Sequence, residues 1–599
     1  MNCILSEKRH VTDCKNASNS VSVLFFVKIG FGNKLLMPVF NRKPGCGFAC
    51  VFTSILSLWI LTGSCTQGRQ FTREAFAALP KPGIIHSTIV CRSDHSRSYA
   101  LLIPGSFADY PTALKTPDYD TARVPLFPLI IAFDPHGAGS LPIERYKSLA
   151  ERFGYLMVGS NDIKNGLPVD TTQKIIRTLV QEIVTTYPVD TGRVYLMGFS
   201  GGARVASLTG LYFLKVRGVI GCGAGFSGNG YAPPFQFDYY GMAGWGDFNV
   251  GELLSLEKPL REAGFRHHIA TWPGIHEWPP EEEMEKAFRW ITTNAMRDRQ
   301  ILPDTALTNL IARESDLEIS TNLRKEYLPD ALAACRFALS CLHDLSPLSS
   351  FTQFMDSITH SSLYIRQQQY RESLMRKEET EQQQLMDAVL SKDMGWWKEW
   401  KVNMATKNKG GNGKDQGSKF KDQSSKIKDQ RSKFKDQGKS EKEEGRRRNV
   451  ERESVHGKGE PENCDQKMPE DVSRETHDVD FFLREDTLYN RRMLAFMGLY
   501  CYMQSGSELS KGSDPTAAKV IDIYELIEPQ NPEANYLRAR VYARQGKQDL
   551  ALKQLNMAIV KGFNDIARME SQEEFIALKN DQGFKDIEKR LNNQKVITR

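Results

Sequence analysis

The residues best suited to chemistry lie in segment 197–202 (MGFSGG), between a stretch that predicts a strand and one that predicts a helix. Glycines on both sides of Ser200 allow a sharp strand-to-helix turn that raises the serine hydroxyl above the end of a sheet. Ser200 is therefore a candidate nucleophile, and the N–H of Gly201, at the start of the helix, is a candidate oxyanion donor. A surface Gly/Ser turn without chemistry is the alternative.

A serine nucleophile needs a base, and in this arrangement the base and the acid follow the serine in sequence. His276 is the candidate base, because its loop directly follows a predicted strand, His267–Trp272, and such loops build the sites of parallel sheets. His267 and His268 lie inside that strand, so we expect them to pack or to face solvent.

Asp247 is the candidate acid, in the loop after the predicted strand Tyr239–Met242. Its task would be to hold the imidazole tautomer and stabilise the imidazolium. Asp238 begins the same strand and should lie at its far end. Glu277 adjoins His276, but neighbouring residues rarely point at each other.

A second oxyanion N–H is expected from the turn after the predicted strand Pro128–Phe133, from Gly137 or Ala138. Asp134 and His136 in the same turn precede the nucleophile, so we assign them loop shaping or substrate contact.

The elements that must position these residues alternate from Gly83 to about Arg297, which predicts a doubly wound, mostly parallel sheet covered on both faces. The other expected strands are Ser98–Pro104, Tyr155–Gly159, Arg193–Met197, which follows a turn at Asp190–Gly192, and Gly218–Gly221. The expected helices are Arg145–Phe153, Ala203–Leu214, Gly251–Ala263 and Glu281–Asn294. A further helix is expected between Asp170, which would cap it, and Pro188, which would end it.

Four segments together resemble the α/β-hydrolase superfamily: DPHGAG (134–139), GFSGGAR (198–204), AGWGDFN (243–249) and GIHEWPP (274–280). They look most like secreted esterases of the polyhydroxybutyrate-depolymerase, feruloyl-esterase and acetylxylan-esterase type.

The resemblance implies acyl-enzyme chemistry on a small-molecule or polymer ester, in which Ser200 attacks the carbonyl, His276 moves the proton and Asp247 orients it. The amides of Gly201 and of the Gly137 turn would hold the oxyanion. Because the same site serves esters, thioesters and peptides, a serine peptidase remains open. So does a hydrolase-like domain without activity that binds proteins through helical repeats.

No cofactor or metal is expected. Residues 223–228 match GxGxxG, but Asn229, Gly230, Pro233 and Pro234 forbid the helix that would bind a pyrophosphate. The sequence has no HExxH, Walker A, EF-hand or CxxC motif.

An apolar stretch, Gly47–Gly63, follows Arg42 and Lys43 and precedes Cys65. It resembles a bacterial lipoprotein signal with Cys65 as the lipidated residue, although Thr62 stands where leucine is usual. We expect a lipid-anchored envelope protein, periplasmic or surface-facing, that contacts the membrane through Cys65. A cleaved signal with secretion, a simple anchor and a buried helix are alternatives, and Met37 is a candidate translation start.

The C-terminal half is expected to be helical apart from a linker. Residues 401–450 are poor in large apolar residues and repeat KDQGSKF, KDQSSKI and KDQRSKF, one apolar residue per heptad, which favours a disordered linker over a coiled coil. Residues 531–564 resemble a tetratricopeptide repeat, on the spacing of Ala539, Tyr542, Gly546, Ala551, Leu555 and Ala558. A degenerate upstream unit would contain an inserted loop, Ser505–Pro515; an unrelated helical hairpin is the alternative. The repeats are a candidate surface for a protein partner.

The expected organisation has six segments. They are a signal segment (1–65), a short linker (66–82), the hydrolase domain (83–297), a helical segment (298–400), the basic linker (401–475) and the repeat domain (476–599). The net charge of +6 does not indicate nucleic-acid binding, because residues 401–450 hold 16 Lys and Arg against 7 Asp and Glu, leaving 63 against 66 elsewhere. A composition of 40% hydrophobic and 25% charged residues excludes collagen-like and fully disordered chains.

Overall fold

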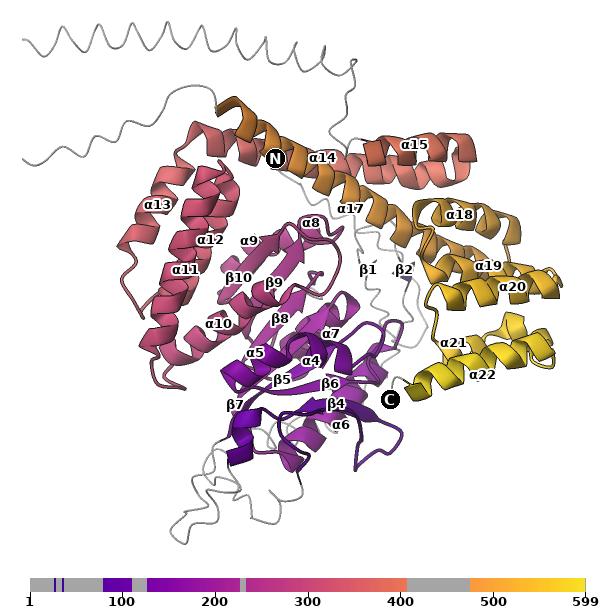
Figure 1. Ribbon diagram of the computed structural model, residues 1–599, viewed down its shortest axis with the longest axis horizontal. Coiled ribbons are helices and arrows are strands. Elements are labelled where there is room, and N and C mark those ends of the chain that lie inside the picture. The colour runs from indigo at the N-terminus through magenta and orange to yellow at the C-terminus, as the bar shows by residue number, and fades with distance from the viewer. Residues whose placement is uncertain are drawn as a thin grey trace, which may run out of the picture. The chain divides into compact units, whose positions relative to one another are not determined.

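A computed structural model describes residues 26–27, 35–36, 79–109, 126–226, 233–406 and 474–597 (Figure 1). The predicted signal segment with Cys65, the candidate start Met37 and nearly all of the predicted basic linker lie outside the described residues. Strands β1 (Phe26–Val27) and β2 (Leu35–Leu36) form a separate two-stranded antiparallel sheet.

An eight-stranded sheet forms the α/β part, with the strand order β10-β9-β8-β7-β5-β6-β4-β3. The strands are β3 (Ile85–Val90), β4 (Ser98–Leu102), β5 (Phe127–Phe133), β6 (Leu156–Ser160), β7 (Val189–Phe199), β8 (Gly218–Cys222), β9 (Asp238–Gly244) and β10 (His267–Trp272). Strand β9 pairs in parallel with β8 and β10, as β5 does with β6, whereas β4 is antiparallel to both of its neighbours. The sheet is mostly parallel, with helices between its strands like the sheets of α/β-hydrolases, which confirms the expected fold class.

Four inner strands are buried because they consist mostly of apolar residues, with Ser160 in β6 and Asp238 in β9 as buried polar exceptions. Every residue of β5, β6, β8 and β9 is buried, as expected of strands covered on both faces of a parallel sheet. Strand β10, at one edge, is fully buried only at Trp272. Strand β3, at the other edge, was not among the expected strands, because its sequence IHSTIV mixes polar with apolar residues.

The helices of this part are α4 (Ser140–Arg145), α5 (Lys147–Phe153), α6 (Val169–Thr186), α7 (Gly201–Tyr212), α8 (Val250–Leu254), α9 (Glu257–Glu262) and α10 (Glu281–Arg297). One expected helix, Arg145–Phe153, is present as α5, which begins at Lys147 because Tyr146 leaves the helical region with a φ of −117°. A second, Gly251–Ala263, is broken in two. It breaks at Ser255–Leu256, and Pro259 lies in the first turn of the new helix, where its missing N–H is tolerated.

Two local predictions are wrong. Asp170 does not cap α6; Pro168 occupies the cap position, and Asp170 lies in the first turn, where its charge suits the helix dipole. The expected turn at Asp190–Gly192 is part of β7, where Asp190 accepts a hydrogen bond from the N–H of Gly192 and pairs with Arg193.

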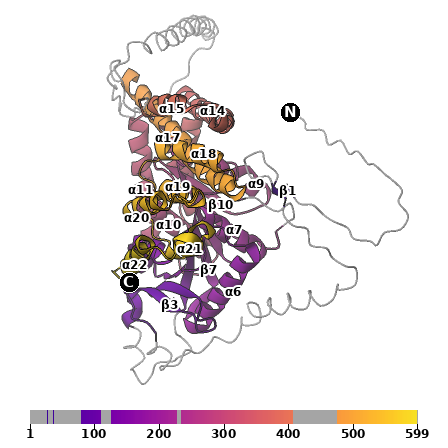
Figure 2. The same ribbon diagram turned by 90° about the vertical axis from the view of Figure 1, so that its right-hand side faces the viewer.

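All the regular elements described after α10 are helices, as predicted (Figures 1 and 2). Its helices are α11 (Thr305–Arg324), α12 (Leu328–Leu342), α13 (Ser349–Thr359), α14 (Ser362–Ser391), α15 (Met394–Thr406), α17 (Arg474–Ser510), α18 (Asp514–Ile527), α19 (Pro532–Arg544), α20 (Gln548–Val560), α21 (Ile566–Ser571) and α22 (Gln582–Ile597). The expected inserted loop Ser505–Pro515 is wrong, because α17 continues to Ser510 and α18 begins at Asp514.

Helices α19 and α20 pack as a hairpin, and the small and large residues that predicted it share one buried cluster. Ala539, Ala551, Leu555 and Ala558 are all buried there, with Phe563. A helical hairpin is thus present, and its assignment to the tetratricopeptide family stays a prediction. Across the ranges that the structure covers, none of the helices combines the length and apolarity needed to cross a bilayer.

We predict that His268 makes the fold sensitive to mild acid. Its ring packs between Tyr240 and Phe337, and burial lowers its pKa from an ordinary value of about 6.5 to about 4. Between these pH values the unfolded chain binds a proton that the folded chain does not, so stability present above pH 6.5 falls as the pH drops toward 4. In urea unfolding, His268→Gln should flatten this decline.

The neighbouring His267 provides a control of opposite sign. Its contact with Glu257 raises its pKa, so His267 adds stability below its unfolded pKa and loses it as the pH rises. His267→Gln should therefore steepen the decline in acid. An unchanged pH dependence in His268→Gln would contradict the prediction.

Candidate active site

Ser200 stands at the turn between β7 and α7 in a strained backbone conformation. Its φ is 52°, in the left-handed region that residues with a Cβ avoid. The N–H of Ser200 donates to the carbonyl of Cys222 at 2.8 Å, and the N–H of Ala203 donates to the carbonyl of Ser200 at 3.1 Å. A Cβ on Gly198 would lie 2.2 Å from the carbonyl oxygen of Gly202, so only glycine fits there. The sequence motif thus forms the sharp strand-to-helix turn that its glycines predict.

His276 lies between Ser200 and Asp247. Its Nε2 is 3.1 Å from Oγ of Ser200, and its Nδ1 is 2.9 Å from Oδ2 of Asp247. With the proton on Nδ1, the ring donates to Asp247 and leaves Nε2 to accept the hydroxyl proton of Ser200. The structure therefore brings the three predicted residues together, with His276 hydrogen-bonded to Ser200 on one side and to Asp247 on the other.

The carboxylate of Asp247 is fully buried, and hydrogen bonds reach both of its oxygens. Oδ2 contacts His276, and Oδ1 accepts the backbone N–H of Asn249 at 2.8 Å. Because a buried carboxylate without partners is costly, these bonds hold Asp247 in one orientation.

The loop that carries Asp247 (residues 245–249, the acid loop) and the loop that carries His276 (residues 273–280, the base loop) are bonded to each other through their backbones. Strands β9 and β10 pair up to Gly244 opposite Trp272, and the loops continue this pairing. The N–H of Trp245 donates to the carbonyl of Trp272, and that of Gly246 to the carbonyl of Gly274, each at 2.7 Å. Asp247 and His276 therefore lie on two loops whose backbones are hydrogen-bonded to each other just beyond the sheet.

Aromatic side chains enclose the His276 ring. The ring centroid lies 4.7 Å from that of Phe199 and 4.4 Å from that of Phe248, and Trp278 packs on Phe199 at 5.5 Å. About a fifth of the His276 side chain remains exposed. These three aromatic residues were not predicted from the sequence, although each lies within two residues of a predicted catalytic residue.

Asn249 was not predicted from the sequence either. Its side-chain amide donates to the carbonyl of Gly223 at 2.8 Å, just beyond the end of β8, while its N–H holds Asp247. Nearby, the guanidinium of Arg204 on α7 pairs with Glu252 on α8 at 2.5 Å. The acid loop is thus tied to β8, and the helix that follows it is tied to α7.

The other acidic and histidine candidates lie away from these contacts. Asp238 begins β9 at its far end and contacts Arg266 and Asn294. His267 contacts Glu257, and His268 lies 3.3 Å from the hydroxyl of Ser340. Glu277 is exposed.

The predicted oxyanion donors occupy two turns. Gly201 is the first residue of α7, whose first amides have no partner within the helix. Gly137, between β5 and α4, has a φ of 75°, and a Cβ there would lie 2.9 Å from the carbonyl oxygen of Asn161. Its N–H donates to the carbonyl of Asp134 at 3.1 Å, which leaves the Ala138 amide as the better of the two predicted donors in this turn. Asp134 also accepts the N–H of His136, a contact that shapes the loop.

The described ranges contain no cluster of three or more His, Cys, Asp or Glu side chains arranged to bind a metal. In the GxGxxG segment, Gly223 serves the acid loop through its carbonyl, and Ser227–Gly228 lie outside the described residues.

No protein-family model matches the sequence, and no curated protein is detectably similar to it. Among solved structures, the chain is similar to S-formylglutathione hydrolase FrmB from Staphylococcus aureus, with 12% identity and a TM-score of 0.28 over 36% of this chain and 98% of that one. It is similar to the fluorophosphonate-binding serine hydrolase FphF of the same organism (11% identity, TM-score 0.27, 35% of this chain and 98% of that one). It is also similar to esterase B from Lactobacillus rhamnosis (14% identity, TM-score 0.27, 42% and 98%). These values are too low to assign a family or an activity, so the fold class rests on the sheet and helices described above.

We predict that the backbone strain at Ser200 is measurable as stability. Because glycine accepts the left-handed region without a Cβ penalty, Ser200→Gly should be more stable than Ser200→Ala by about 1 kcal/mol. The free energies of unfolding of the two variants are compared in urea. Because both variants lack the hydroxyl, the difference reports the backbone strain.

Ser207, buried in the interior of α7, provides the matched control. Helix interiors disfavour glycine, so Ser207→Gly should be less stable than Ser207→Ala by about 1 kcal/mol. A Ser200→Gly variant no more stable than Ser200→Ala would show that the turn is unstrained.

Proposed function

We propose that the chain is a serine hydrolase that cleaves carboxylic esters through an acyl-enzyme on Ser200. The observation that carries the proposal is the His276 ring, hydrogen-bonded to the Ser200 hydroxyl on one side and to the buried Asp247 carboxylate on the other. A strained serine, a base within 3.1 Å and an orienting acid are the parts that nucleophilic catalysis requires.

In the proposed reaction, Oγ of Ser200 attacks the ester carbonyl carbon while Nε2 of His276 takes the hydroxyl proton. The resulting imidazolium is stabilised by Asp247, and the amides of Gly201 and Ala138 are the proposed donors to the oxyanion. His276 then gives its proton to the departing alkoxide, which leaves as an alcohol. Water attacks the acyl-enzyme with His276 again as base, releasing the carboxylic acid and restoring Ser200.

The ester preference is supported by the motif resemblance, and the intact triad argues against a domain that has lost activity. A decayed site usually lacks one of its catalytic residues, whereas here all three are present and bonded in order.

We predict that a fluorophosphonate probe labels the wild-type protein and does not label Ser200→Ala. His276→Gln should strongly slow labelling, and Asp247→Asn should lower kcat by roughly 10⁴-fold, because the asparagine disturbs the imidazole tautomer. His268→Asn is the matched control, since its ring lies elsewhere and labelling should persist. A folded wild-type protein that the probe leaves unlabelled would refute the proposed function.

We further predict that the protein hydrolyses short-chain nitrophenyl esters and has negligible activity on peptide nitroanilides of similar size. The phenolate leaves readily, whereas an amine leaves only after proton transfer from a well-placed acid. Comparing kcat/KM for the two substrate types decides the matter, and a preference for the anilides would make the protein a peptidase.

A further inference from the structure

Two helices of the C-terminal half contact the loop that carries Asp247. Arg492 on α17 donates from Nη1 to the backbone carbonyl of Trp245 at 2.5 Å, across 247 residues of sequence. The guanidinium of Arg371 on α14 lies over the Trp245 ring, 4.4 Å from its centroid. A Cβ on Gly246 would lie 3.5 Å from the Cβ of Arg491, so α17 also runs close to the next residue of the loop.

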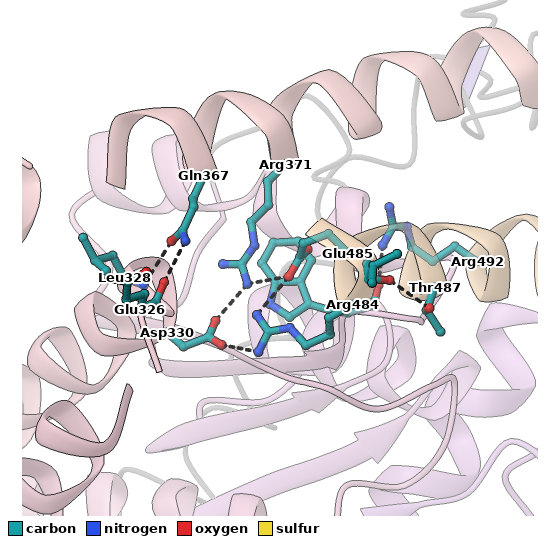
Figure 3. Close-up of polar contacts among 11 residues, drawn as sticks. Glu326, Leu328, Asp330, Gln367, Arg371, Arg484, Glu485, Thr487 and Arg492 are labelled. Atoms are coloured by element: carbon teal, nitrogen blue, oxygen red, sulfur yellow. Dashed lines mark hydrogen bonds and ion pairs between the residues drawn. The ribbon is translucent and has the colours of Figure 1, made fainter. Parts of the chain in front are cut away.

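The Arg371 guanidinium is fixed by a network of alternating charges (Figure 3). It donates to Asp330 on α12 at 2.8 Å and to Glu485 on α17 at 2.9 Å. Arg484 donates to the same two carboxylates, at 2.6 and 2.9 Å. Two acids and two arginines from three helices thus close a ring, and Arg371 and Glu485 are almost fully buried.

The Asp330 carboxylate of this ring is stabilised in its charged form by its two arginine partners. Burial acts against the charge of Asp330, but the guanidinium groups of Arg371 and Arg484 outweigh it and hold the pKa of that carboxyl below its usual range. Asp330 therefore stays ionised at neutral pH and holds Arg371 in position.

Arg492 is oriented by a pair of its own. Its Nε donates to Glu378 on α14 at 2.6 Å, and both side chains are more than nine-tenths buried. Because the guanidinium is planar, a bond at Nε fixes the direction of Nη1, which points at the Trp245 carbonyl. A charged donor on that carbonyl fixes the peptide between Trp245 and Gly246.

We infer that Arg492, supported by Arg371, is a positioning residue that sets the acid loop, so that α14 and α17 are part of the catalytic apparatus. The peptide that Arg492 holds precedes Asp247 by one residue, and the N–H of the intervening Gly246 is already bonded to the base loop. A shift of this peptide moves the carboxylate relative to His276. The inference rests on the proposed function.

The test is a double-mutant cycle with Arg492→Gln and Asp247→Asn, measured as kcat and KM on a nitrophenyl ester. Arg492→Gln should lower kcat by about 10- to 100-fold with KM within about twofold, since a misplacement of about 1 Å costs on that order. In the Asp247→Asn background the same change should cost little more, because Arg492 acts through Asp247. Arg492→Lys, which keeps a charged donor, should recover part of kcat.

Arg538→Gln is the matched control. Arg538 on α19 is also buried, but among the described residues its ion pairs and hydrogen bonds go to α18, to Asp522, Glu525 and the Ala518 carbonyl, and not to the acid loop. It should lose less stability in urea than Arg492→Gln, because Asp522 and Glu525 are partly exposed whereas Glu378 is buried, and it should keep kcat. If Arg492→Gln does not fold, Arg492→Lys takes its place in the cycle. Lysine keeps a charge beside Glu378 but lacks the planar guanidinium that aims a second donor at the Trp245 carbonyl, so kcat should still fall.

The outcomes separate the two proposals. Losses that multiply in the double mutant, or an equal loss of kcat in Arg538→Gln, would overturn the positioning role while the hydrolase activity stands. A wild-type protein that neither reacts with fluorophosphonate nor turns over the ester would overturn the proposed function and this inference with it.

Discussion

The candidate site depends on the parallel pairing of β9 with β10 and on its continuation into the loops that follow. Asp247 and His276 share one side-chain hydrogen bond across 29 residues of sequence. Such a bond contributes about 1.5–3 kcal/mol, whereas ordering each backbone residue costs about 1–2 kcal/mol. The bond alone therefore cannot hold two free loops together. The backbone bonds from Trp245 and Gly246 to the base loop supply that order before the side chains meet.

The end of β8 provides the second fixed point, because it holds both the nucleophile and the acid. The carbonyl of Cys222 accepts the N–H of Ser200, and the next carbonyl, that of Gly223, accepts the side chain of Asn249 beside Asp247. A serine at a φ of 52° persists only where its surroundings fix it, and this bond is one of the constraints. Backbone and side-chain hydrogen bonds thus fix the nucleophile, the base and the acid relative to the ends of three neighbouring strands, β8, β9 and β10.

Local sequence patterns predicted the sheet and the three candidate catalytic residues because strand ends and glycine-flanked serines are local signals. What they missed depends on partners distant in sequence. The carbonyl of Trp245 and the side chain of Arg492 are 247 residues apart, and no spacing rule joins them. The expected inserted loop Ser505–Pro515 is wrong for a different reason: the glycine- and serine-containing segment indicated a loop, whereas α17 continues to Ser510 and α18 begins at Asp514.

The buried arginines on α14 and α17 are better explained by geometry than by stability. An interior ion pair seldom stabilises a fold more than apolar residues of the same volume would, because desolvating the charges offsets their attraction. An apolar side chain cannot aim a donor at one carbonyl oxygen, whereas a guanidinium fixed by a carboxylate can. Arg492 does this at Trp245, and Arg371 covers the ring of the same residue. Trp245 lies two residues before Asp247, the buried catalytic candidate. At this position a directional hydrogen bond can fix the loop in a way that apolar packing cannot.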